Sequence, residues 1–162
     1  PRILTALVDD FDGSREILAR RRLTQKQKET ARNRLELASF LQYMLPGSPS
    51  IYYGDEAQME GHKDPFNRRT YPWGKENKDL IAHYQALGKL RKDCPALAFG
   101  DIRFFCAQNG RLCFTRGYQG ETLRVYVNQS DAPWQLPKGK ILFAKHFEGN
   151  TLQSMGYCLI RE

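Results

Sequence analysis

Two acidic side chains in the segment Ser50 to Gly74, SIYYGDEAQMEGHKDPFNRRTYPWG, are candidates for acid and base chemistry. Asp55 and Glu56 are adjacent in the chain, and neighbours in an extended chain point to opposite faces. The two carboxylates of a glycosidase must instead face each other across about 5 to 9.5 Å. We therefore interpret Asp55 and Glu56 as residues that orient the loop.

Asp64 and Arg68 in the same segment are better suited to binding. A carboxylate accepts hydrogen bonds from vicinal hydroxyls and a guanidinium donates to them, so the pair could fix a sugar ring. Tyr71 or Trp73 could stack on the apolar face of that ring. The alternative is an ion pair between positions i and i+4 that stiffens the loop, and both interpretations remain open at this point. A long loop without secondary structure of its own most often binds something.

The histidines and cysteines do not form a recognisable metal or redox motif. The histidines are scattered, and the cysteines match no Cys-x-x-Cys spacing; they are His62, His83, His146, Cys94, Cys106, Cys113 and Cys158. We predict no metal site and no cofactor.

A hairpin signal at Asn109-Gly110 brings two cysteines together. Symmetric folding about this dipeptide places Cys106 opposite Cys113, in a hydrogen-bonded pair of the two strands. We expect neighbouring free thiols rather than a bridge, because we expect a reducing, cytoplasmic location.

The net charge of +7 lies largely in one segment. Eight basic residues between Arg15 and Arg34 are opposed only by Glu16 and Glu29. A basic segment of this kind raises the alternative of nucleic-acid binding. No aromatic residue interrupts it, so the stacking platform for single strands is missing. We interpret it as a solvated helix with its preceding loop and expect no nucleic-acid partner.

Before Pro95, the apolar residues recur mostly at helical spacing. The pattern predicts helices over Arg15 to Arg21 after Ser14, over Gln25 to Leu45, and over Asp79 to Lys92 with Asn77 or Asp79 as the cap. The run Ser50 to Gly54 is typical of a short strand that is buried on both faces. This order is the one expected near the end of a β/α barrel.

After Pro95 the period changes to two, which predicts strands. They cover Ile102 to Gln108, Arg111 to Arg116, Thr122 to Asn128, Trp134 to Leu136, Lys140 to Phe143 and Tyr157 to Arg161. One face of the first hairpin should carry Phe105, Ala107, Leu112 and Phe114, and the next strand Leu123, Val125 and Val127. We predict an α+β chain: residues 1–93 form the end of a (β/α)8 barrel with one strand, and residues 94–162 form an antiparallel β-sandwich.

Two strings of residues carry a resemblance to a known family. LPGSPSIYYGDE, followed by DPFNRRTYPWG, resembles the eighth-strand region of the α-amylase family, and most closely its neopullulanase and cyclomaltodextrinase branch. The segment from Pro1 to Thr5 resembles the residues after the family's Asn-His-Asp motif, with Arg2 at the trailing arginine. The resemblance extends along the chain and identifies it as a C-terminal fragment. The missing initiating Met is in turn what we expect of a chain that starts in mid-protein.

The resemblance implies a role in hydrolysing α-1,4-glucosidic bonds, and α-1,6 bonds as a further option, by a retaining mechanism. The family's catalytic carboxylates would all fall before Pro1, so no catalytic residue is expected here and the chain should be inactive alone. Asp64 and Arg68 match the residues that hold the glucose two units to the non-reducing side of the cut. Gln58 and His62 depart from the small and the aromatic residue expected there.

The partners implied are an α-glucan or maltooligosaccharide and the remainder of the catalytic domain. Open edges and apolar helix faces also make self-association an option. No membrane partner is expected, because no apolar stretch approaches the roughly 20 residues that span a bilayer. The alternative is a carbohydrate-binding or interaction module that acts through the sandwich.

Overall fold

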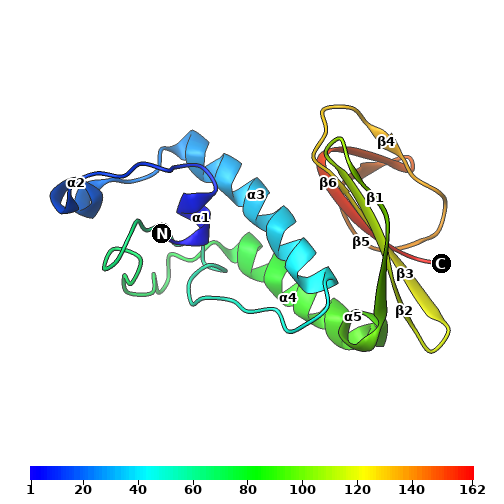
Figure 1. Ribbon diagram of the computed structural model, residues 1–162. Helices are drawn as coiled ribbons and strands as arrows, with labels where there is room; N and C mark the ends of the chain where they lie inside the picture. Colours follow the sequence, from blue (N-terminus) through cyan, green and yellow to red (C-terminus); the bar gives the residue numbers. More distant parts are fainter. The chain divides into compact units, whose positions relative to one another are not determined.

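The computed structural model describes residues 1–162, which form two compact units (Figure 1). The helical unit comprises Pro1–Ala38 and Ser50–Ala86, and the sheet unit comprises Ser39–Pro49 and Leu87–Glu162. The two long helices each begin in the helical unit and end in the sheet unit. The predicted domain boundary between residues 93 and 94 stays a prediction.

Three helices lie close to the segments that the apolar spacing predicts: α2 (Arg15–Arg20), α3 (Gln25–Met44) and α4 (Lys78–Asp93). Two short helices, α1 (Ile3–Ala6) and α5 (Pro95–Phe99), were not predicted. Leu35, Phe40 and Met44 in the second half of α3 are buried. None of the helices combines the length and the apolar character that a membrane crossing requires.

Side chains satisfy one end of each long helix, the start of α4 and the end of α3. The Asn77 side-chain oxygen accepts a hydrogen bond from the Leu80 N–H at 3.0 Å, so Asn77 is the N-cap of α4. In the sheet unit, the Arg91 guanidinium donates to the carbonyls of Tyr43, Leu45 and Gly47 at the end of α3. A positive group at the C-terminus of a helix also complements the helix dipole.

The predicted strand Ser50 to Gly54 is wrong, because Ser50 to Tyr52 have no regular secondary structure and Tyr53 and Gly54 begin a turn. Ile51, Tyr52 and Tyr53 are 41%, 46% and 43% exposed, and the Asp55 N–H bonds locally to the Tyr52 carbonyl at 3.1 Å. A buried parallel strand needs a partner on each side. None of the strands lies in the helical unit, so this run has no partner, and the predicted barrel arrangement is not confirmed.

The strands form one antiparallel sheet in the sheet unit, in the order β1-β2-β3-β6-β4, with β5 also paired to β6. They are β1 (Asp101–Gln108), β2 (Arg111–Tyr118), β3 (Glu121–Asn128), β4 (Trp134–Gln135), β5 (Lys140–Glu148) and β6 (Thr151–Arg161). All six strands belong to one hydrogen-bonded sheet, so the predicted arrangement as two sheets of a sandwich is not confirmed.

The register of the first hairpin confirms one prediction and corrects another. Cys106 lies opposite Cys113 as predicted, and both thiols are free. Phe104 lies opposite Phe114, however, so Phe105 is an extra residue in a bulge. Phe105 therefore does not share the buried face of Phe114: it is 53% exposed.

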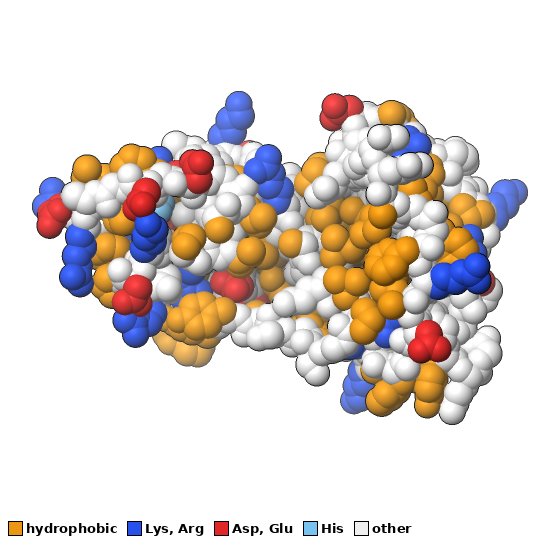
Figure 2. Space-filling view, viewed as in Figure 1, with side chains coloured by type: hydrophobic (Ala, Val, Ile, Leu, Met, Phe, Trp, Pro, Cys, Tyr) orange, Lys and Arg blue, Asp and Glu red, His pale blue; other side chains and the backbone are white.

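Each face of the sheet has its own core. On one face, buried Phe114, Val125 and Leu159 are cross-strand partners, and the Tyr157 ring stacks on Phe40 of α3 at 4.5 Å between centroids. A second cluster contains Cys113, Tyr126, Leu136, Leu152, Cys158 and Ile160. Figure 2 shows further apolar side chains in patches on the surface, interspersed with charged ones.

Arg116 on β2 is fully buried in the sheet unit. Its guanidinium donates to the Met44 carbonyl at the end of α3 and to the Gly100 carbonyl after α5, both at 2.7 Å. This one side chain satisfies carbonyls at the ends of two helices. It should therefore stabilise the sheet unit, because a buried carbonyl without a donor is costly.

Candidate substrate-binding loop

The segment Ser50–Gly74, here called the loop, lies in the helical unit and is anchored at its start by Arg2. The side chain of Arg2 is fully buried and donates to the Tyr53 carbonyl at 2.6 Å. Its guanidinium lies 4.9 Å from the Tyr52 ring centroid and 4.6 Å from that of Tyr53. These contacts are of the cation–π type and fix the turn that precedes Gly54.

Asp55 and Glu56 are both engaged in the internal structure of the loop. Asp55 is buried and lies 3.4 Å from Arg2 Nη1. Burial raises the pKa of Asp55, and the neighbouring Arg2 opposes that rise. Glu56 accepts a hydrogen bond from the Gly54 N–H at 2.9 Å. This geometry agrees with the interpretation that the two residues orient the loop.

Asp64 and Arg68 are brought together at the surface. Arg68 Nη2 lies 2.7 Å from Asp64 Oδ1 and 2.8 Å from Oδ2, and the two side chains are 62% (Asp64) and 60% (Arg68) exposed. An exposed ion pair contributes only about 0.2 to 1 kcal/mol, so its members can rearrange at little cost to meet a ligand. The carboxylate and the guanidinium thus offer acceptors and donors side by side.

Two aromatic rings lie nearby in the sequence and touch each other. The Tyr71 and Trp73 ring centroids are 4.6 Å apart, and Trp73 is 81% exposed. Partial burial raises the pKa of Tyr71, and the charge of Glu56 and a hydrogen bond to it act in the same direction. An indole this exposed can stack on the apolar face of a sugar ring.

Contacts with the first residues of the chain hold the loop just before Asp64. The Gly61 N–H donates to Thr5 Oγ1 at 2.9 Å, and the Gly61 carbonyl accepts from the Arg2 N–H at 2.8 Å. Lys63 Nζ lies 2.7 Å from Asp12 Oδ2. The approach to Asp64 is therefore defined by contacts that span more than fifty residues of sequence.

His62 is a buried part of this anchor. Its Nε2 lies 4.0 Å from Asp9 Oδ2, and Asp9 is itself held by Arg21 at 2.7 Å. Burial lowers the pKa of His62, although Asp9 acts in the opposite direction. The hydrogen bond from Arg21 is the main cause that lowers the pKa of Asp9. The unexpected residue type at position 62 is thus explained by a contact inside the helical unit.

Gln58, the other departure, adopts a left-handed conformation with φ of 65°. Such a conformation favours glycine, so a residue smaller than Gln58 would fit the backbone here. The Gln58 side chain compensates through two hydrogen bonds: it donates to the Lys28 carbonyl at 3.3 Å and accepts from the Asn77 side chain. It also lines a polar pocket of about 320 Å³ together with Gln25, Lys28 and Glu60.

Half of the basic side chains between Arg15 and Arg34 form ion pairs within the helical unit. Arg21 pairs with Asp9, Lys28 with Glu60 at 3.4 Å, and Arg32 with Glu36 at 2.9 Å. These pairs support a scaffolding role for the segment. The chain holds no group of three or more His, Cys, Asp or Glu side chains arranged to bind a metal ion.

Sequence reasoning found the loop and its exposed pair but missed the anchors. Arg2, Thr5 and Asp9 are far from the loop in sequence, and no local pattern links them to Gly61 or His62. The closest signal was the isolated acidic turn around Asp9 and Asp12, beside an excess of basic residues.

Comparisons with known proteins were made for the sequence and for the fold. The chain matches no model of a known protein family. It is 39% identical over 120 residues to an amylopullulanase from Thermoanaerobacter thermohydrosulfuricus, a match that covers 67% of this chain and 8% of the relative. It is 35% identical over 108 residues to a cyclomaltodextrinase from Geobacillus thermopakistaniensis, covering 64% of this chain and 18% of the relative.

The solved structures lead to the same group. A debranching enzyme from Nostoc punctiforme superposes with a TM-score of 0.71 at 28% identity, covering 80% of this chain and 31% of that protein. A maltogenic amylase from S. marinus superposes with a TM-score of 0.69 at 27% identity, covering 83% and 20%. The chain therefore spans only a small part of the length of each protein it matches.

These likenesses define a class, the glycoside hydrolases that the relatives' names describe. Within that class, this chain belongs to the α-amylase family, and its relatives include amylopullulanases, cyclomaltodextrinases and maltogenic amylases.

Proposed function

We propose that this chain is a C-terminal portion of an α-glucan hydrolase and that its loop binds the substrate. The observation that carries the proposal is the exposed Asp64–Arg68 pair on an anchored loop of a chain in the α-amylase family. Asp64 accepts hydrogen bonds from glucose hydroxyls, Arg68 donates to them, and Trp73 or Tyr71 contacts the ring. The substrate class is an α-glucan or maltooligosaccharide.

We further propose that the catalytic carboxylates lie outside this chain. Asp55 and Glu56 are engaged with Arg2 and Gly54, and they do not form a pair across an open cleft. The chain alone therefore binds without hydrolysing. Joined to the remainder of the catalytic domain, it completes a retaining enzyme.

A binding experiment tests the role of the pair. Titration of the chain with maltoheptaose, followed by calorimetry, should give a Kd that rises about tenfold or more in Asp64→Ala and in Arg68→Ala. The reason is that a lost hydrogen bond to a charged group costs about 1.5 to 3 kcal/mol. Lys89→Ala is the matched control, because Lys89 and Asp93 form another exposed pair at positions i and i+4. An equal effect of the control, or none in either loop variant, contradicts the proposal.

A hydrolysis experiment tests the division of labour. We expect no release of reducing sugar from maltodextrin by the chain alone, and release when the chain is expressed with the missing part of a related catalytic domain. Hydrolysis by the purified chain alone, abolished by Asp55→Asn or Glu56→Gln, would show that the catalytic groups lie here instead.

A further inference from the structure

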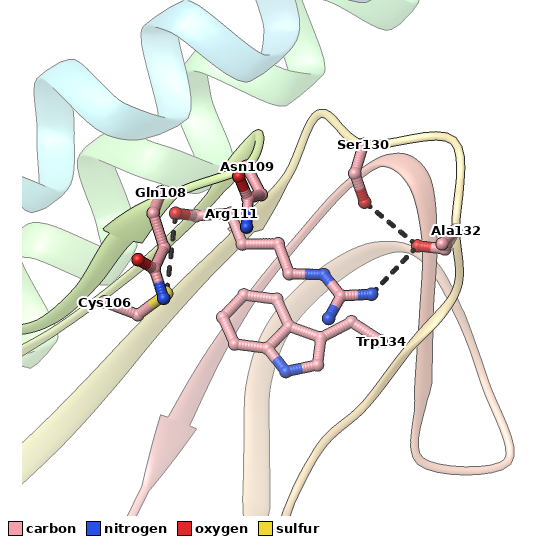
Figure 3. A pocket seen from close by; sticks show the side chains of 7 residues that line it. All are labelled: Cys106, Gln108, Asn109, Arg111, Ser130, Ala132 and Trp134. Carbon is pink, nitrogen blue, oxygen red and sulfur yellow. Dashed lines mark hydrogen bonds between the residues drawn. The ribbon is translucent and has the colours of Figure 1, made fainter.

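A pocket of about 310 Å³ lies in the sheet unit, apart from any residue of the loop. Its walls are the turn of the β1–β2 hairpin, the segment after β3, and Trp134 at the start of β4 (Figure 3). The lining residues are Cys106, Gln108, Asn109, Arg111, Ser130, Ala132 and Trp134. This volume is at the low end of the range for ligand pockets, which suits a small ligand or a short segment of a chain.

A buried side-chain amide, that of Asn128, holds one wall of the pocket in place. The Asn128 side chain is fully buried and donates to the carbonyls of Ala132 and Leu152, both at 3.0 Å. Its oxygen accepts from the Ser130 N–H at 3.1 Å and from the Ser130 hydroxyl at 2.6 Å. The segment after β3 is thereby fixed to the body of the sheet.

The hairpin turn is joined to the same segment. The Gln129 N–H donates to the Gly110 carbonyl at 2.6 Å, and a Cβ at Gly110 would lie 2.9 Å from the Ser130 nitrogen. Only glycine allows this close approach, and Gly110 also has a positive φ of 73°. Both walls are therefore positioned before any ligand arrives, as a binding site requires.

The lining combines an aromatic surface with two side-chain amides that make no hydrogen bond. The Arg111 guanidinium lies 5.4 Å from the Trp134 ring centroid and donates to the Pro133 carbonyl at 2.9 Å. Figure 3 shows Arg111 extending along the indole toward Ala132, with the side chains of Gln108 and Asn109 at the opposite end. Gln108 and Asn109 are exposed, and neither side chain makes a hydrogen bond in the structure.

The charges of the pocket narrow the class of ligand. No carboxylate lines it, which disfavours a cation, and Arg111 is the only charged group and is already held by carbonyls and the indole. A phosphate or a nucleic acid normally meets several cations. The amides of Gln108 and Asn109 beside an indole instead suit a neutral ligand with hydroxyl groups and an apolar CH surface.

We infer that this pocket is a second saccharide-binding site, here called the hairpin site, which takes a short segment of an α-glucan chain. The choice of an α-glucan among saccharides rests on the proposed function, whereas the existence of the site rests on the pocket alone. Gln108 and Asn109 donate to and accept from sugar hydroxyls, and Trp134 supplies the apolar contact.

The two tryptophans of the chain allow the two sites to be followed separately, since Trp73 lies in the loop and Trp134 in the hairpin site. The chain labelled with 5-fluorotryptophan is titrated with maltoheptaose, and the two fluorine signals are assigned with Trp73→Phe. We expect a saturable shift of the Trp134 signal, with a Kd in the millimolar range or tighter.

Gln108→Ala should raise the Kd from the Trp134 signal by about fivefold, because it removes one hydrogen bond worth about 1 kcal/mol. Gln85→Ala makes the same change at an exposed position of α4 and should have no effect. The inference is overturned if the Trp134 signal does not move, or if Gln108→Ala leaves the Kd obtained from that signal unchanged. An equal shift with cellohexaose overturns the choice of an α-glucan.

The outcomes also separate this inference from the proposed function. A shift of Trp73 alone supports the loop site and removes the hairpin site, and a shift of Trp134 alone does the reverse. Cys106 gives a second readout, because it lines the pocket while the other three cysteines are buried. Maltoheptaose should slow alkylation of Cys106 by iodoacetamide several-fold, and an unchanged rate speaks against occupancy.

Discussion

Arg116 places a guanidinium inside the sheet unit, where two backbone carbonyls depend on it. Replacing it by methionine keeps much of the length but removes both donors. We expect Arg116→Met to lower the free energy of unfolding by about 2 to 5 kcal/mol, because each buried carbonyl left without a partner costs about 1 to 3 kcal/mol. Urea unfolding followed by circular dichroism measures the loss.

Arg103→Met on the neighbouring strand is the control for this change. Arg103 is exposed and has a contact with the Phe105 ring, so its removal should cost less than about 1 kcal/mol. If the two variants were equally stable, the buried hydrogen bonds of Arg116 would not be a main support of the sheet unit.

The lowered pKa of His83 predicts how the free energy of unfolding depends on pH. Burial lowers its pKa to about 4, and the charge of Arg32 acts in the same direction. In the unfolded chain the pKa is near 6.5, so between these two values the unfolded state binds more protons. Stability should therefore fall as the pH drops from about 6.5 to 4, by on the order of 2 kcal/mol, and change little from this cause above pH 7.

Unfolding of His83→Gln over the same pH range measures this contribution. The decrease between pH 7 and pH 4 should be smaller in the variant than in the parent chain. His146→Gln is the comparison at an exposed histidine. An identical decrease in all three proteins would mean that other groups govern the acid response.

Whether the sequence could predict the role of a candidate residue depends on how close its partners lie in the chain. Asp64 and Arg68 are four positions apart, so the sequence alone could predict both an ion pair and a shared ligand, and the structure shows the ion pair. The roles of Arg2 and His62 depend on Tyr53 and Asp9, which are not close in sequence. Periodicity and spacing carry no information about such contacts.

Asn77 connects helix α4 to the loop that precedes it. Its side-chain oxygen caps the helix through Leu80, and its side-chain nitrogen donates to Gln58. Asn77→Ala should lower the free energy of unfolding by about 1 to 2 kcal/mol, since it removes both bonds. Asn77→Asp keeps the cap and loses the bond to Gln58, so it should cost less.

Ser14→Ala is the matched test at a second helix. Ser14 precedes α2 but makes no capping bond to the backbone, so the change should cost less than about 0.5 kcal/mol. Thermal unfolding of the three variants ranks them. If Asn77→Asp were as damaging as Asn77→Ala, the bond to Gln58 rather than the cap would be the important one.

The elements that sequence reasoning predicted well are those whose apolar period is long and uninterrupted. Helices α3 and α4 agree with the predicted bounds within one residue at each end. The run Ile51 to Tyr53 is too short to show a period, and its apolar character alone does not supply the neighbours that a strand needs. The bulge at Phe105 was missed because a strict alternation of two assumes that no residue is inserted.

Exposed apolar side chains in the helical unit should affect the behaviour of the isolated chain. Ile3, Phe11, Ile17, Ile51, Tyr52, Tyr53 and Trp73 are all exposed. Exposed apolar side chains can pack against those of another copy of the chain, so we expect self-association at high concentration. Light scattering coupled to gel filtration should show an average mass that rises with concentration.

The double variant Ile17→Ser/Ile51→Ser should reduce this association, because it replaces two exposed branched side chains of the helical unit. Ile141→Ser, an exposed position of the sheet unit, serves as the control. Equal masses for the parent and the double variant at every concentration would show that these residues do not mediate association.

The fold as a whole was predicted in its class and not in its arrangement. The change of period after Pro95 separated the long helices from the strands but did not predict the short helix α5, which begins at Pro95. Alternation along one strand states which face is buried but not which strand lies beside it. Alternation could therefore not predict that β6 pairs with three different strands and so unites them in one sheet.

The end of α3 can be completed only after Arg91 has been made. The carbonyls that it satisfies are up to 48 residues earlier in the chain. During synthesis, the last turn of α3 is made before Arg91. That turn should therefore stay frayed until α4 has been added. Pulsed hydrogen exchange during refolding should show the amides near Tyr43 becoming protected together with those near Arg91, later than those in the middle of α3.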